Sequence, residues 1–321
     1  MNRRILLLGT TGLALGISGC SNSSNGPSSV PAKKVTLDDC PALKAYIDSL
    51  CDIPGGTFKM GSEDYFMEGG LKFGRITFDD EKPAHKVRIS AFRMGKTPVT
   101  VDMFEEYCNN TNLNMPPEPE PRWRGARKFN IGWVDKDHPI VNVNWNECKK
   151  FADWASEVSR VKLTLPSEAQ FEYVCRGGKD GLEYPWGQQF DHKVVWCTGY
   201  KFERGSTGSV NRRVYVWKDH PWGLIDLVGN VEQWCRDWYD PQWYQLPQAS
   251  ERDVVNDDSA PSVEVKVDNT ITQNGARCVR GTSWNDDGAS LPEMFRCSSR
   301  SYDHAESRTV FRGFRLSAGP G

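Results

Sequence analysis

The chain has 321 residues, with 40 lysines and arginines against 42 aspartates and glutamates. A net charge of −2 with no basic cluster argues against nucleic-acid binding. Twelve tryptophans and 29 glycines indicate a loop-rich protein with an aromatic core, and this length fits one large domain or two smaller ones.

The first twenty residues are typical of a bacterial lipoprotein leader. Arg3 and Arg4 precede an apolar run, residues 5–17, that is short for a membrane span. The run ends at Cys20, which we expect to carry the lipid anchor after removal of a signal peptide, residues 1–19. Residues 20–36 are polar and predict a tether. Ser21 after the cysteine favours the periplasmic face of the outer membrane, so we expect an extracytoplasmic, membrane-anchored protein.

The first half of the remaining chain carries local signals for helices and strands. We expect a short helix over 37–52 and strands over 57–60 and 85–94, where apolar and polar residues alternate. Thr100 predicts the start of a helix through Cys108. Residues 112–137 include a proline- and glutamate-rich stretch and predict an exposed insertion.

Two capping boxes then mark helix starts. Asn144 with Glu147 predicts a helix to about Val158, and Ser167 with Gln170 predicts one to about Arg176. Helical periodicity is absent after this point. Residues 240–275 are polar and acidic and predict a second insertion, while residues 280–284 and 311–316 predict short strands.

Nine cysteines follow Cys20: Cys40, Cys51, Cys108, Cys148, Cys175, Cys197, Cys235, Cys278 and Cys297. In an oxidising compartment most should be paired, and an odd number leaves at least one over. Cys40 and Cys51 bracket the first predicted helix and are candidates for a local disulfide. The five histidines are scattered and there is no Cys-x-x-Cys spacing, which argues against a zinc site.

Residues 224–234, LIDLVGNVEQW, combine an apolar pair, a Gly-Asn turn and a tryptophan. This mix favours a loop with carbonyl groups turned inward. Asp226 and Gln233 would add side-chain oxygens, and a hard cation such as calcium prefers several oxygen ligands.

A series of motifs resembles the formylglycine-generating enzyme family, the sulfatase-modifying factors. The motifs occur in the family's order: IPGGTFKMGS (53–62), KTPVT (96–100), HPIVNVNW (138–145), LPSEAQFEYVCRGG (165–178), YPWG (184–187), GLIDLVGNVEQW (223–234), RGTSW (280–284), FRCSSR (295–300) and GFR (313–315). The resemblance covers roughly residues 52–316. It implies an α+β, C-type-lectin-like fold of the formylglycine-generating enzyme type, with little regular structure, over residues 37–321.

The resemblance also implies a structural calcium site. Its ligands would be the Asp226 side chain, the carbonyls of Gly229 and Val231, and Gln233, where the family usually has glutamate. Glutamine keeps an oxygen but loses a charge, which lowers the expected affinity. The alternative is a structural turn without a metal.

The family's copper-binding cysteine pair is missing. The first cysteine falls at Asp286 and the second near Leu291, and Cu(I) requires soft thiolates. We therefore expect neither bound copper nor formylglycine generation by that mechanism. The alternative is a copper pair formed by Cys278 and Cys297, which flank the region.

The equivalent cleft predicts five candidate site residues: Ser283, Trp284, Asp286, Asp287 and Arg296. An acid–base role for Asp286 and Asp287 would rest only on their location. The alternative is that Ser283 and Trp284 belong to the core and the two aspartates form a solvated turn.

Three functions fit these observations. The first is a non-catalytic lipoprotein that binds a protein partner, such as an envelope component or a periplasmic toxin. The second is an envelope oxidoreductase or maturation enzyme that works without the copper cysteines. The third is a structural scaffold.

Overall fold

The computed structural model describes residues 34–63, 78–119, 129–199, 206–257, 265–267, 270–272 and 275–319. Contacts divide the chain into Met1–Lys34 and one compact unit, Val35–Gly321. The predicted signal peptide, Cys20 and most of the tether lie outside the described residues. None of the helices in the described ranges has the length and apolar character needed to cross a membrane.

Four α-helices lie in the first half of the compact unit: α1 (Pro41–Asp48), α2 (Val101–Thr111), α3 (Trp145–Ser159) and α4 (Glu168–Cys175). The capping boxes at Asn144 and Ser167 form as predicted, each accepting a hydrogen bond from the backbone N–H three residues on. Thr100 precedes α2, but its hydroxyl donates to Asp102 instead of capping the helix.

Two four-stranded sheets form the centre of the unit. The first has the strand order β1 (Cys51–Ile53), β4 (Phe92–Met94), β12 (Ser317–Ala318) and β5 (Leu163–Thr164). The second has the order β10 (Arg300–Asp303), β9 (Ala276–Arg280), β6 (Glu232–Tyr239) and β11 (Arg312–Gly313). Two hairpins, β2 (Gly56–Met60) with β3 (His85–Ile89) and β7 (Val265–Val267) with β8 (Thr270–Thr272), complete the described strands.

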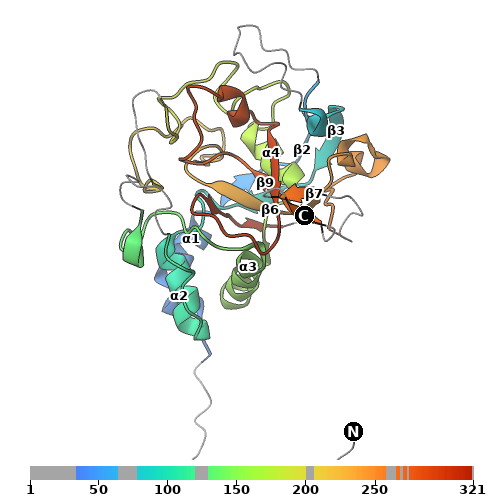
Figure 1. Ribbon diagram of the computed structural model, residues 1–321. Helices are drawn as coiled ribbons and strands as arrows, with labels where there is room; N and C mark the ends of the chain where they lie inside the picture. Colours follow the sequence, from blue (N-terminus) through green and yellow to red (C-terminus); the bar gives the residue numbers. More distant parts are fainter. Residues whose placement is uncertain are drawn as a thin grey trace, which may run out of the picture. The chain divides into compact units, whose positions relative to one another are not determined.

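The helices cover different parts of this framework. Helices α1, α2 and α3 pack together on one side, and α4 lies against β6 and β9 (Figure 1). The apolar core follows the same division. Phe104, Phe151 and Phe314 lie in a cluster with the first three helices, whereas Phe171 and Phe295 lie in a second cluster beside α4.

Several element predictions were wrong at their boundaries. The helix predicted over 37–52 ends at Asp48, and Cys51 begins a strand. The strand predicted over 85–94 is two strands, β3 and β4, which belong to different sheets. The strand predicted over 280–284 ends at Arg280, and the eight-residue strand β6 was missed.

The predicted Cys40–Cys51 disulfide does not form, since both thiols are free. Helix α1 separates the two residues, and its eight residues span about 12 Å. Disulfides require Cα atoms within about 7 Å. The Cys40 thiol instead accepts a hydrogen bond from Asn110 on α2.

Candidate functional site

The loop after β9 holds the positions where the family resemblance places the copper cysteines. Asp286 is half-buried, and its Oδ2 accepts hydrogen bonds from the Ser283 N–H at 2.7 Å and the Ser283 hydroxyl at 2.8 Å. Burial raises the pKa of Asp286. Leu291 is exposed. The Asp286 carboxylate is therefore hydrogen-bonded within its own turn, and Leu291 offers only an alkyl group. Neither side chain is a ligand for Cu(I).

The other predicted cleft residues are not gathered at one open surface. Ser283 is 1 % exposed and Trp284 is 7 % exposed, with its ring packed edge-on against Phe129. Asp287 accepts hydrogen bonds from the N–H groups of Ala289 and Ser290 and from the Ser290 hydroxyl, which lowers its pKa. Ser283 and Trp284 therefore belong to the core, and both aspartates organise a turn.

Arg296 does not line a cleft, which corrects its assignment. Its side chain is fully buried and forms a two-bond ion pair with Glu81, with distances of 2.6 and 2.8 Å. It also donates to the Ser298 hydroxyl. These contacts give Arg296 a structural role inside the unit.

The alternative cysteine pair is not assembled either. The Cys278 thiol points to Glu168 and to the Trp238 carbonyl, whereas the Cys297 thiol is hydrogen-bonded with that of Cys175. Burial raises the pKa of both Cys278 and Cys297 well above the usual range, so neither is poised as a thiolate.

The predicted calcium ligands are occupied by nitrogen donors. Both carboxylate oxygens of Asp226 accept from Arg212, one of them at 2.8 Å, and the Asn230 amide adds a further bond at 2.8 Å. The Gln233 oxygen accepts from Arg315 at 2.5 Å. Because calcium needs these oxygens directed at the ion, the arrangement of the residues does not fit a calcium site.

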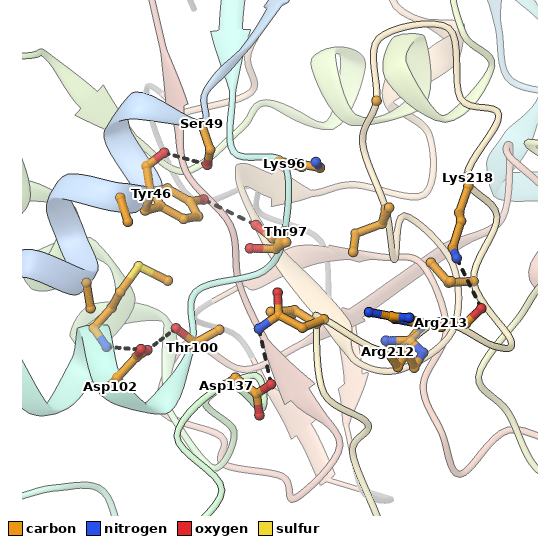
Figure 2. Close-up of a pocket in the computed structure, with 18 residues that line it drawn as sticks. Tyr46, Ser49, Lys96, Thr97, Thr100, Asp102, Asp137, Arg212, Arg213 and Lys218 are labelled. Atoms are coloured by element: carbon orange, nitrogen blue, oxygen red, sulfur yellow. Dashed lines mark hydrogen bonds between the residues drawn. The ribbon is translucent and has the colours of Figure 1, made fainter.

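An open pocket lies beside this segment, and sequence reasoning missed it. It has a volume of about 680 Å³ and lies between α1 and residues 210–225. Figure 2 shows Tyr46 and Ser49 on one side, Arg213 and Lys218 on the other, and Lys96 between them.

The pocket combines apolar walls with free positive charge. Its apolar surface comes from Ala42, Ala45, Tyr46, Met103, Val210, Val216 and Ile225. Within the described ranges, Lys96 and Arg213 form no ion pair, and Lys218 donates only to the Arg213 carbonyl.

Two carboxylates also line this pocket, but both already have hydrogen-bond partners. Asp102 accepts from Thr100 and from the Met103 N–H, and Asp137 accepts from Ser209 and Asn211. Burial alone would raise the pKa of Asp137, but the hydrogen bonds from Ser209 and Asn211 outweigh it and lower the pKa. The three cations therefore remain available to an anionic group.

Comparison with known proteins connects this architecture to a family. The model of the sulfatase-modifying factor enzyme 1-like domain matches residues 40–318. The chain belongs to this family. The predicted resemblance and the α+β fold of this type are thereby confirmed.

Individual relatives and structures agree with the assignment. The chain is 26 % identical to the formylglycine-generating enzyme of Thermomonospora curvata, over 84 % of this chain and 92 % of that protein. It is 25 % identical to a Bos taurus protein named inactive C-alpha-formylglycine-generating enzyme 2, over 85 % of this chain and 89 % of that protein. The solved structure of PvdO from Pseudomonas aeruginosa aligns with a TM-score of 0.59 and 22 % identity, over 84 % of this chain and 93 % of that one.

Among the described residues, no group of three or more histidine, cysteine, aspartate or glutamate side chains is arranged to hold a metal ion. The family's fold is thus present, while the residues at its redox positions have other roles. Three residues of the pocket, Lys96, Arg213 and Lys218, could not be found from one local motif, because they come from two separate parts of the chain.

Proposed function

We propose that this protein is a lipid-anchored envelope protein whose formylglycine-generating-enzyme-like domain is non-catalytic and binds a protein partner. The observation that carries the proposal is the loop after β9, where Asp286 is committed to Ser283 and Leu291 supplies no metal ligand. One relative, from Bos taurus, is named inactive C-alpha-formylglycine-generating enzyme 2, so its name describes it as lacking formylglycine-generating activity.

The pocket between α1 and residues 210–225 supports a binding role. An amphipathic pocket whose three cations have no carboxylate partner among the described residues suits an acidic segment of another protein. We propose that the partner docks there, at the periplasmic face of the outer membrane, with the predicted lipid at Cys20 holding the chain at the surface. Calcium is not required in this proposal.

The proposal is tested by capture from detergent-solubilised envelopes with the full lipidated chain as bait. The wild-type chain and the control variant Lys149→Glu, on the exposed face of α3, should retain the same discrete protein. The double variant K96E/R213E should lose it, and the wild-type interaction should weaken as salt rises because exposed charges are screened. Equal capture by all three chains would contradict the assignment of the pocket.

The maturation enzyme without the copper pair is the alternative, and the similarity of this chain to the formylglycine-generating enzyme of Thermomonospora curvata favours it. Metal analysis of the purified chain separates the two proposals. Stoichiometric copper or iron would favour an enzyme. A chain without redox metal that still captures its partner would favour a binding protein.

A further inference from the structure

The segment where the family resemblance implies a calcium ion has its own internal cation. Arg212 lies in the loop before the signature segment, and its side chain is 7 % exposed. Its guanidinium forms a two-bond ion pair with Asp226, whose side chain is 2 % exposed. The pairing is bidentate, which is the geometry in which guanidinium and carboxylate bind most strongly.

The remaining donors of Arg212 are also satisfied locally. Nη1 donates to the Ser209 carbonyl at 2.9 Å, and Nε and Nη2 donate to the Tyr215 carbonyl at 3.3 and 3.2 Å. The guanidinium carbon also lies 5.3 Å from the centroid of the Trp196 ring. Arg212 therefore connects its own loop, the signature segment and residue 196.

A second guanidinium, that of Arg315 in the GFR motif, holds the same segment from the C-terminal end of the chain. Arg315 Nη2 donates to the carbonyls of Ile225 and Asp226, each at 2.8 Å, and Nε donates to Gln233. The Gln233 amide in turn donates to the Asp226 carbonyl at 2.7 Å and to the Val231 carbonyl at 3.5 Å. Asp226 has a φ of +55°, a left-handed conformation that these bonds hold in place.

The charges oppose a bound calcium ion as clearly as the contacts do. The predicted ligand set includes one carboxylate, from Asp226, and this carboxylate is already neutralised by Arg212. A divalent cation placed among these oxygens would also face the positively charged guanidinium of Arg212, in a buried region where repulsion is poorly screened.

We infer that Arg212 replaces the calcium ion that the family resemblance implies, so that the signature segment is held by this chain's own residues and the protein folds without calcium. Arg315 belongs to the GFR motif on which the resemblance rests, so the replacement is assigned to Arg212. Arg212 performs the cross-linking that an ion would otherwise perform, because it joins the Asp226 side chain to the carbonyls of Ser209 and Tyr215.

The wild-type chain gives the first test. Its thermal unfolding temperature should be the same in excess calcium and in a calcium chelator, and calorimetric titration with calcium chloride should show no stoichiometric binding. A fall of several degrees in chelator, or one tightly bound calcium ion per chain, would overturn the inference. Both measurements use the wild-type chain, so neither depends on whether a variant folds.

Variants then test the role of Arg212 directly. Arg212→Ala should lower the unfolding temperature by roughly 10 °C, since it leaves the buried Asp226 carboxylate without its cation. The control Arg213→Ala removes the neighbouring exposed arginine and should change the temperature little. Equal effects of the two substitutions would overturn the inference.

A second variant checks that the ligand set itself is intact. The double variant R212A/Q233E removes the internal cation and adds a carboxylate where the family usually has one. Added calcium should raise its unfolding temperature by several degrees while leaving that of the wild type unchanged. A calcium response that is equal in wild type and double variant would contradict the replacement.

Discussion

Charged residues serve opposite purposes in two regions of this molecule. On α4, Glu168 and Glu172 are buried and are shared among Arg176, Arg280 and Arg300, with N–O distances from 2.7 to 3.4 Å. In the pocket between α1 and residues 210–225, Lys96, Arg213 and Lys218 are exposed and have no carboxylate partner among the described residues.

The difference separates charges that build the fold from charges left for a ligand. In the buried cluster the arginines hold the pKa values of both glutamates low in spite of burial, so the carboxylates stay ionised inside the protein. Removing one member strands a buried charge, which is costly. Removing a pocket cation leaves no buried charge unpaired, so we expect it to weaken binding of the partner without lowering the stability of the fold.

The largest expected effect follows from breaking the buried cluster. Arg280→Met removes a fully buried guanidinium from both glutamates and should lower the free energy of unfolding by about 3–5 kcal/mol. The control Lys149→Met breaks an exposed ion pair with Asp153 and should cost less than about 1 kcal/mol. Denaturant unfolding measures both, and a similar small loss in each would contradict the role given to the cluster.

An intermediate effect depends on pH and on one buried histidine. The His220 Nε2 donates to the Val174 carbonyl, Nδ1 accepts from the backbone, and burial lowers the pKa of the ring from 6.5 to about 4. The folded state therefore holds the neutral ring, and the unfolded chain takes up a proton first as pH falls. This contribution to stability is complete above pH 6.5 and is lost as the pH falls toward 4.

His220→Gln should remove part of that pH dependence. The variant should be less stable than the wild type at pH 7, because it loses the ring's hydrogen bonds. Between pH 7 and 4.5, however, its free energy of unfolding should fall by roughly 2 kcal/mol less than that of the wild type. Thermal unfolding across this range measures the difference. His304→Gln, at a less buried ring, serves as control. Parallel profiles for wild type and His220→Gln would contradict the assignment.

The smallest effect on stability belongs to the pocket. Lys96→Ala and Lys218→Ala should each change the free energy of unfolding by no more than about 0.5 kcal/mol, because both side chains are exposed and neither has a buried partner in the described part of the chain. Both should nevertheless weaken capture of the partner. A large loss of stability would show that these cations serve the fold, which would erase the contrast between the two regions.

Local signals in the sequence were sufficient for part of the fold. The capping residues Asn144 and Ser167 mark the starts of α3 and α4 because the hydrogen bonds that define a helix start are local. Strand β6 could not be predicted in the same way. It carries Glu232, Arg236 and Asp237 among buried aromatic residues. Their partners lie far away in the sequence: the Arg312 side chain bonds to Glu232, the Asp257 side chain pairs with Arg236, and the Glu168 N–H donates to Asp237.

In the candidate site, too, local sequence was sufficient for some features but not for those that depend on distant contacts. The missing copper cysteines could be read from positions 286 and 291, and the structure shows what those residues do instead. The calcium prediction read the oxygen ligands from one short segment, but their partners are Arg212 and Arg315, which lie outside it. Local sequence identifies ligands, whereas long-range contacts decide whether they are free to bind an ion.

The most direct measurement is an assay of the purified full chain, supplied with copper and oxygen, on a peptide that carries the cysteine motif of a sulfatase. Mass spectrometry of the peptide reports conversion of cysteine to aldehyde. The account predicts that the cysteine is unchanged, because Asp286 and Leu291 cannot hold Cu(I). Copper-dependent appearance of the aldehyde would contradict it.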